Sequence, residues 1–200
     1  VGVGLGLSIK MKNEDRISTV FLGDGATEEG VFYESLNFAI LKDLPVLFIC
    51  ENNMYSVYSG LEARQPENRK IYQMVMAIGA ESVHADGYDV QDSYDKLQKA
   101  VKYVKEEKKP YFIELDTYRF REHCGPNFDN DLGYRENAEY EKFLDKDPLV
   151  ILEEKLKLLG LNEEIEKKKS SIRHDIQKAF DMAKMSKWPD NNNLNRYLYR

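Results

Sequence analysis

Two short apolar runs, each followed at once by small polar residues, constrain the fold of this chain most. Residues 17–22 are largely β-branched or apolar and lead into Gly-Asp-Gly, and residues 46–50 lead into Glu-Asn-Asn. Short runs of this kind are typical of buried strands in a parallel sheet. The segment between them carries apolar residues at helical spacing, namely Phe32, Leu36, Ala39 and Ile40. The sequence therefore predicts a strand, a helix and a second strand parallel to the first.

The same alternation continues along the chain. Residues 70–79 predict a short helix, residues 81–84 a third strand and residues 111–117 a fourth. Asp89 is placed to cap a helix between the last two strands. The apolar stripe of that helix is Val90, Tyr94, Leu97, Val101 and Val104. Alternating strands and helices predict an α/β fold with a mainly parallel sheet flanked by helices.

The two ends of the chain differ from this pattern. The chain opens with Val1 inside a glycine-rich segment, residues 1–12, that favours a helix, so we expect the N-terminal part of the domain to be missing. After residue 146 the pattern becomes helical, and we expect residues 147–200 to form a C-terminal helical extension of the α/β domain, residues 1–146. Its two apolar stripes, separated by a capping glycine at Gly160, are Leu149, Leu152, Leu156 and Leu159, then Ile165, Ile172, Ile176, Phe180 and Ala183.

Composition excludes several classes of function. The net charge of −6 argues against a general nucleic-acid binder, because phosphate backbones need a basic face. No apolar run approaches the roughly 18 residues that a membrane helix needs. Cys50 lies inside an apolar run and is expected in the core, and His84 stands without an evident partner. We therefore expect neither nucleic acid nor a membrane as a partner.

The polar residues after the first two strands carry the chemistry. Loops at the carboxyl ends of parallel strands are where open α/β sheets bind ligands. Mg²⁺ prefers hard oxygen ligands, which the Asp24 carboxylate, the Asn53 amide and the Tyr55 carbonyl can supply. Gly25 allows the close backbone approach that a diphosphate requires. Each motif alone is a common turn, but together on one strand–helix–strand unit they predict a Mg²⁺–diphosphate site.

This combination resembles a known family. Gly-Asp-Gly and Asn-Asn, with 26 residues between them, form the fingerprint of thiamine-diphosphate enzymes. Residues 23–56 look like the alpha subunit of the decarboxylating component of 2-oxo acid dehydrogenase complexes, such as the pyruvate, branched-chain and acetoin dehydrogenases. The likeness continues through residues 85–90, 113–119, 133–135 and 147–148. It implies a thiamine-diphosphate-binding fold.

The resemblance also implies roles for individual residues. Asp24, Asn53 and the Tyr55 carbonyl would hold Mg²⁺, while Gly25 and Ala26 would contact the diphosphate of thiamine diphosphate. In the long polar loop of residues 118–137, Arg119 matches a family arginine that neutralises the diphosphate. His123 matches a family histidine that lies over the cofactor and assists the reaction, so it is the expected catalytic residue.

The loop also departs from the family pattern. Cys124 follows His123, where complex-forming mitochondrial members have a phosphorylatable serine, and Asn127 stands near the place of a family aspartate. Kinase control at this loop is therefore not expected, and the bacterial cytoplasm is the expected location rather than the mitochondrial matrix.

The implied activity is oxidative decarboxylation of a pyruvate-like 2-oxo acid, with acyl transfer to a lipoyl-bearing acyltransferase. The glutamate that activates the cofactor normally comes from a beta subunit, and no residue of this chain matches it. We therefore expect an α₂β₂ assembly. Two alternatives stay open: a thiamine-dependent carboligase that uses an aldehyde or sugar acceptor, and a non-catalytic scaffold subunit.

Overall fold

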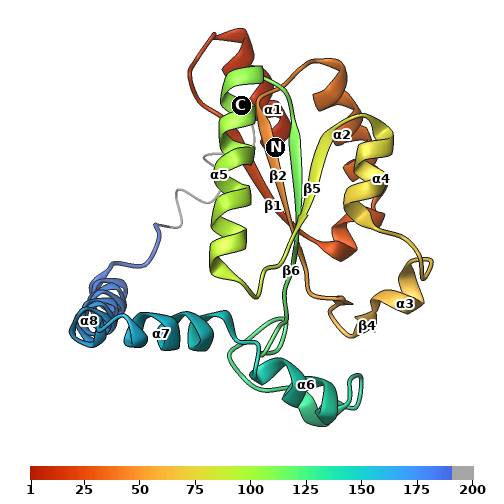
Figure 1. The fold of residues 1–200 in the computed structure, drawn as a ribbon. Coiled ribbons are helices and arrows are strands. Elements are labelled where there is room, and N and C mark those ends of the chain that lie inside the picture. The colour runs from red at the N-terminus through yellow and green to blue at the C-terminus, as the bar shows by residue number, and fades with distance from the viewer. Residues whose placement is uncertain (191–200) are drawn as a thin grey trace. The chain divides into compact units, whose positions relative to one another are not determined.

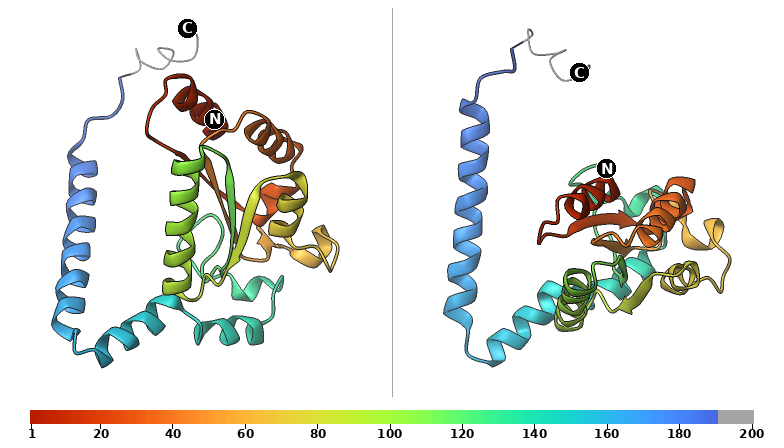
Figure 2. Two further views of the ribbon diagram at one scale, coloured as in Figure 1. Left: turned by 45° about the horizontal axis from the view of Figure 1, so that its top comes forward. Right: turned by 90° about the horizontal axis from the view of Figure 1, so that it is seen from above.

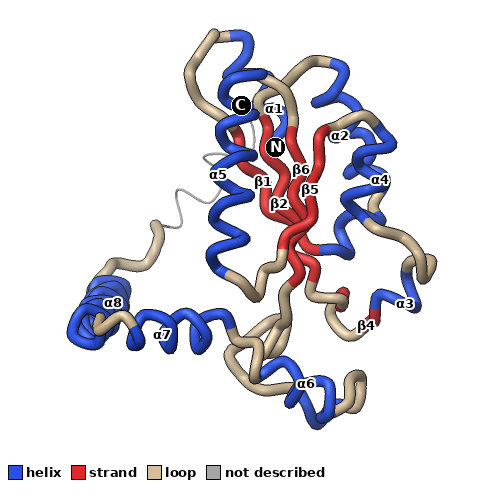
Figure 3. The backbone as a smooth tube through the Cα atoms, in the orientation of Figure 1, coloured by secondary structure: helices blue, strands red, loops and turns tan. Residues whose placement is uncertain are grey.

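The computed structural model describes residues 1–190, which fall into two compact units, Val1–Val150 and the helical part from Ile151 onward. Within the described residues the first unit holds a parallel four-stranded sheet (Figures 1 and 3). Its strands, β1 (Ser18–Gly23), β2 (Val46–Asn52), β6 (Tyr111–Asp116) and β5 (Glu81–Ala85), lie side by side in that order. The predicted α/β fold class is confirmed. Chain order alone did not predict that β6 lies between β2 and β5.

Helices cover both faces of this sheet (Figure 2). One face carries α1 (Gly2–Met11), α2 (Gly30–Leu41) and α4 (Ile71–Ile78), and the other carries α5 (Val90–Glu107). Strand β2 is buried on both sides, which explains its unbroken apolar run. Its side chains alternate between the two cores: Val46, Phe48 and Cys50 join the first, and Leu47 and Ile49 join the second.

The capping prediction for α5 is confirmed. The Asp89 carboxylate accepts hydrogen bonds from the backbone amides of Gln91 and Asp92. These amides belong to the first turn of the helix and lack partners within it, so the side chain supplies their acceptor. Helix α5 then packs on the sheet through Ala100 and Val104, both fully buried.

The strand register brings three loops to one edge of the sheet. Gly23 lies beside Glu51, and Asn52 lies beside Asp116, so β1, β2 and β6 end together. A 3₁₀ helix, η1 (Asp24–Glu28), follows β1 directly. After β2 come a small antiparallel hairpin, β3 (Tyr55–Ser56) with β4 (Ser59–Gly60), and the one-turn helix α3 (Leu61–Arg64). This edge positions the candidate site.

The polar segment after β6 is partly helical. It contains a 3₁₀ turn, η2 (Asn130–Leu132), and the helix α6 (Asn137–Leu144), which the sequence did not predict. An aromatic cluster holds α6: the rings of Tyr118 and Phe143 stack with centroids 4.2 Å apart, and Tyr88 stacks on Phe143 at 5.5 Å. Contacts between residues so far apart in sequence leave no periodic signal, which explains the missed helix.

Two helices, α7 (Pro148–Leu158) and α8 (Asn162–Met185), follow. Gly160 has φ of +80° and separates them, as predicted for a capping glycine. Lys169 of α8 pairs with Glu153 of α7 at 2.7 Å. No residue from 151 to 190 is buried, and residues 191–200 of the predicted extension lie outside the described part. Among the described residues, no helix is long and apolar enough to cross a membrane.

Candidate metal and diphosphate site

Asp24 is the centre of the candidate site. It follows β1 as the first residue of η1, and only 1% of it is exposed. Its Oδ2 accepts a hydrogen bond from Arg64 Nη2 at 2.5 Å, whereas its Oδ1 is buried without a hydrogen-bond partner in the described chain. Burying a charged oxygen without a partner is unfavourable. The free oxygen is therefore suited to a cation.

Gly25 lies in a close approach between η1 and the hairpin. A Cβ at this position would meet Ser56 Oγ at 2.8 Å and Arg64 Nη1 at 3.4 Å. The Thr27 hydroxyl donates to the Asp24 carbonyl at 2.6 Å and closes the turn. Only glycine fits here without a shift of Ser56, and Ala26 beside it is exposed. Gly25 is half-buried and Ala26 is exposed, at the place where a diphosphate contact is predicted.

The two asparagines after β2 form consecutive side-chain turns. Asn52 Oδ1 accepts from the Met54 amide at 3.0 Å, and Asn53 Oδ1 accepts from the Tyr55 amide at 2.9 Å. Met54 between them has φ of +67°, in the left-handed region. Asn52 is buried and also donates to Glu114 at 2.8 Å, so it anchors the turn to β6. Asn53 is half-buried, and its amide oxygen keeps a second lone pair.

The β3–β4 hairpin joins the two halves of the site. Its Ser56 lies against Gly25, and the Tyr55 hydroxyl donates to Glu139 of α6 at 2.7 Å. Burial and this hydrogen bond raise the pKa of Tyr55, so its hydroxyl stays protonated at neutral pH. The carbonyl of Val57 accepts from Arg119 Nη2 at 2.9 Å. The hairpin thus links the loop after β1 to the loop after β6.

Arg119 presents unused donors. Its Nη2 contacts Val57 and the Tyr134 hydroxyl, but its Nε and Nη1 are buried without a partner among residues 1–190. Asp129 Oδ2 lies 3.6 Å from Nη2 and balances part of the charge. Buried guanidinium donors without an acceptor suit an anionic ligand.

Asp129 and Arg135 hold the loop together, and the sequence did not single them out as site residues. Asp129 is 2% exposed and accepts from Arg135 Nη2 and from the Tyr134 hydroxyl, both at 2.8 Å. Arg135 Nη1 also donates to the Arg119 carbonyl at 2.7 Å. The stretch 133–135 resembles the family sequence, but no spacing rule pairs it with residue 129.

His123 lies at an exposed turn of the same loop. The Glu122 amide donates to the Asn127 carbonyl at 2.9 Å, and the Asn127 side chain donates to Glu122 Oε1 at 2.8 Å. These bonds close a turn with His123 and Cys124 at its exposed tip. Within residues 1–190, His123 makes no hydrogen bond or ion pair. The predicted catalytic residue is therefore not linked by such a contact to Asp24, the predicted metal ligand.

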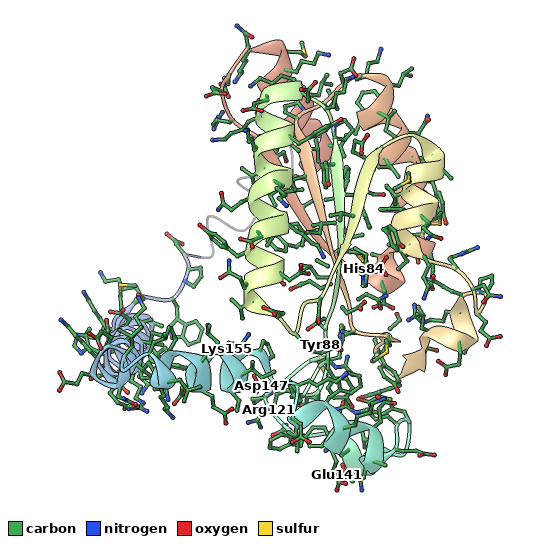
Figure 4. The ribbon with its side chains drawn as sticks, in the orientation of Figure 1. His84, Tyr88, Arg121, Glu141, Asp147 and Lys155 are labelled. Atoms are coloured by element: carbon green, nitrogen blue, oxygen red, sulfur yellow. The ribbon has the colours of Figure 1, made fainter. Side chains whose placement is uncertain are left out.

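A cavity of about 320 Å³ has Asn52 in its lining. It is lined partly by Gln65, Tyr72 and His84. His84, labelled in Figure 4, places its Nε2 2.8 Å from Asp116 Oδ2, so the sequence-based expectation that it has no partner is wrong. The cavity includes Asn52 but none of the residues predicted to contact metal or diphosphate.

Comparison with known proteins places the chain in a family. Residues 1–192 match the family described as Dehydrogenase E1 component, and the chain belongs to it. The predicted resemblance to the alpha subunits of these dehydrogenases is confirmed.

Three relatives make this concrete. The chain is 31% identical over 201 residues to the pyruvate dehydrogenase E1 component subunit alpha of Rickettsia felis, covering 100% of this chain and 60% of that protein. It is 31% identical to the corresponding subunit of Porphyra purpurea, covering 96% of this chain and 55% of that one. It is 30% identical to the testis-specific mitochondrial form of this subunit from Homo sapiens, and the match covers 100% of this chain and 51% of that protein. The chain thus spans little more than half the length of these relatives.

Two solved structures are also similar. A transketolase from Campylobacter jejuni aligns with a TM-score of 0.49 and 26% identity, over 58% of this chain and 19% of that one. The second is the structure of a putative thiamin diphosphate-dependent enzyme from Mycobacterium smegmatis. It aligns with a TM-score of 0.46 and 19% identity, over 59% of this chain and 21% of that one.

Proposed function

We propose that this chain provides the Mg²⁺ and thiamine-diphosphate site of an enzyme that oxidatively decarboxylates a pyruvate-like 2-oxo acid. The acyl group would pass to a lipoyl group on an acyltransferase. The observation that carries the proposal is Asp24 Oδ1, which is buried without a hydrogen-bond partner among the described residues. The names of the relatives support the reaction, since each is a pyruvate dehydrogenase E1 alpha subunit.

The residues after β1 and β2 fit a hydrated, diphosphate-bound Mg²⁺. Asp24 Oδ1, the Asn53 amide oxygen and the Tyr55 carbonyl would supply protein oxygens, the ligand type that Mg²⁺ prefers. The backbone of Gly25 and Ala26 would contact the diphosphate. Thiamine diphosphate, when bound, supplies the electron sink for decarboxylation.

The loop after β6 would complete the site. Arg119 would direct to the diphosphate the two donors that have no partner within residues 1–190, and would neutralise charge there. We assign His123 the catalytic role, because an imidazole can hold or release a proton near neutral pH. The ring is exposed and has no hydrogen-bond partner in the described part of the chain, which leaves it available to substrate or to the lipoyl group.

The assembly is part of the proposal. We propose that the chain works with a beta subunit as α₂β₂ and that the isolated chain is inactive, because it has no match to the activating glutamate of the family. A lipoyl-bearing acyltransferase would receive the acyl group. Cys124 stands where a regulatory serine would be, so we propose a bacterial cytoplasmic enzyme without kinase control at this loop.

Titration calorimetry tests the cofactor site. Thiamine diphosphate is titrated into the full-length protein co-expressed with its beta partner, with and without Mg²⁺. We expect Mg²⁺-dependent binding that Asp24→Ala abolishes. Asp15→Ala, at an exposed residue that precedes β1 and so lies at the opposite end of this strand from Asp24, is the matched control and should bind as the parent does. No Mg²⁺-dependent binding in the intact assembly would refute the proposal and favour a non-catalytic scaffold.

Acceptor assays then test the reaction. The loaded assembly is given pyruvate with a lipoyl domain, or with an aldehyde or sugar. We expect acylation of the lipoyl domain. Carbon–carbon bond formation with the aldehyde, and no lipoyl acylation, would identify a carboligase.

A further inference from the structure

Arg64 joins Asp24 to the hairpin segment, and no motif in the sequence singled it out. Its Nη2 donates to Asp24 Oδ2 and its Nη1 to Glu28 Oε1, both at 2.5 Å. Its Nε donates to the Ser59 carbonyl at 3.1 Å. The side chain is only 10% exposed. Three acceptors from two segments therefore fix the plane of the guanidinium.

The two oxygens of Asp24 are in different situations because of this contact. Oδ2 is bound to Arg64, and Oδ1 is buried without a partner in the described residues. A carboxylate that is free to rotate can present either oxygen in many directions. Because a guanidinium is a rigid planar fork, binding one oxygen sets the direction of the other.

Arg64 could either compete with a metal ion for Asp24 or support Asp24 as a metal ligand. A guanidinium that covered both oxygens would compete with a cation for Asp24, but Arg64 contacts only Oδ2. A cation at Oδ1 need not displace it. Glu28 offsets the remaining repulsion, because it shares the same guanidinium. The geometry therefore favours support of the metal ligand over competition with the metal.

We propose that Arg64 is a positioning residue that holds Oδ2 of Asp24 and so presents Oδ1 to the divalent cation. This inference rests on the proposed thiamine-diphosphate site and adds a residue to it. Groups that orient metal ligands in this way typically change metal affinity by about 10- to 100-fold when removed. Arg64 therefore acts on the metal through Asp24 and not by direct contact.

Binding of Mn²⁺, followed by its electron paramagnetic resonance signal, tests this role without using activity. Mn²⁺ is titrated into the full-length assembly in the presence of thiamine diphosphate. We expect Arg64→Met to weaken Mn²⁺ binding by about 10- to 100-fold. Arg64→Lys should recover part of the loss, because an ammonium can still bind Oδ2 but lacks the rigid fork.

Arg69→Met is the matched control. Arg69 lies five positions further along the same segment and is exposed, and its side chain makes no hydrogen bond or ion pair in the described structure. It should leave Mn²⁺ affinity unchanged. Urea unfolding of each variant separates a change in metal affinity from a loss of folded protein, and Arg64→Lys retains the charge if Arg64→Met does not fold.

Two outcomes would overturn the inference while leaving the proposed function intact. Unchanged Mn²⁺ affinity in both Arg64 variants would make Arg64 a structural brace only. Tighter Mn²⁺ binding in Arg64→Met would make it a competitor of the metal. Failure of the parent assembly to bind Mn²⁺ with thiamine diphosphate would instead refute the proposed function, and this inference with it.

Discussion

The two sides of the candidate site are built in different ways. On the sheet side, Asp24 and Asn53 directly follow β1 and β2, and the register of these two strands fixes where the loops that carry them begin. On the loop side, Arg119 and His123 lie on a long segment without a strand after β6, and a buried ion cluster around Asp129 holds part of it. The metal side thus takes its geometry from the main chain, and the loop side takes it from a few side chains. Four predictions, made with five substitutions and their controls, test this contrast.

The largest effect is expected at Asp129. Asp129→Ala would leave Arg119 and Arg135 near each other without the carboxylate that pairs with both, and removing one partner of a buried pair costs about 3–5 kcal/mol. Urea denaturation should show this loss, and hydrogen exchange should localise it to residues 118–140. Asp131→Ala, at an exposed residue in the same loop, should change stability by no more than about 0.5 kcal/mol. Equal effects of the two would show that the cluster does not hold the loop.

The next largest effect is expected at Arg119, on the affinity for thiamine diphosphate. Arg119→Met removes two buried donors that have no acceptor within the described residues, so the loss should appear on binding the diphosphate. Hydrogen bonds to charged groups contribute about 1.5–3 kcal/mol, which corresponds to about 10- to 100-fold in the Kd of thiamine diphosphate by calorimetry. Arg121→Met, at a side chain that donates to the Pro126 carbonyl and lies over the Phe128 ring, should leave the Kd unchanged. An unaffected Kd in Arg119→Met would exclude this arginine from the site.

Substitutions at the two adjacent asparagines should have different effects, one on stability and the other on Mg²⁺-dependent binding. Asn52→Ala leaves Glu114 without one of its donors and should reduce the free energy of unfolding by about 1–3 kcal/mol. Asn53→Ala should weaken Mg²⁺-dependent binding with a smaller effect on stability, because the one side-chain hydrogen bond of Asn53 within residues 1–190 closes a local turn. Thermal unfolding and calorimetry on both variants check this. Reversed behaviour would mean that Asn52, and not Asn53, faces the cation.

The smallest effect on stability is expected at His123. His123→Ala should change the free energy of unfolding by no more than about 0.5 kcal/mol, because the ring is exposed and forms no hydrogen bond in the part of the chain that the structure describes. Acylation of the lipoyl domain should nonetheless slow by about 10²- to 10⁴-fold, the usual contribution of an acid–base group. Unchanged turnover would remove His123 from the mechanism.

Local patterns predicted the sheet well but not its order. The apolar runs identified all four strands of the described sheet, and the chemistry of Asp89 identified the start of α5. The insertion of β6 between β2 and β5 depends on contacts between segments distant in sequence. The same limit applies to the pair Asp129 and Arg135, which a loop without periodicity brings together.

The C-terminal helices show another limit of pattern reasoning. The segment with the predicted second apolar stripe does form a helix, α8. Its residues Ile172, Ile176 and Phe180 are nevertheless 46%, 52% and 60% exposed. In the first unit, Leu36 and Val75 on comparable stripes are fully buried. Periodicity predicts that a helix has an apolar face, but it does not identify the surface that covers that face.

The contrasting positions of the two cysteines have a practical consequence. Cys50 is buried in β2, and burial raises the pKa of its thiol, so it is protected from thiol reagents. Cys124 is exposed beside His123. Within this chain a maleimide fluorophore would therefore attach at the loop and report its movement without any engineered cysteine.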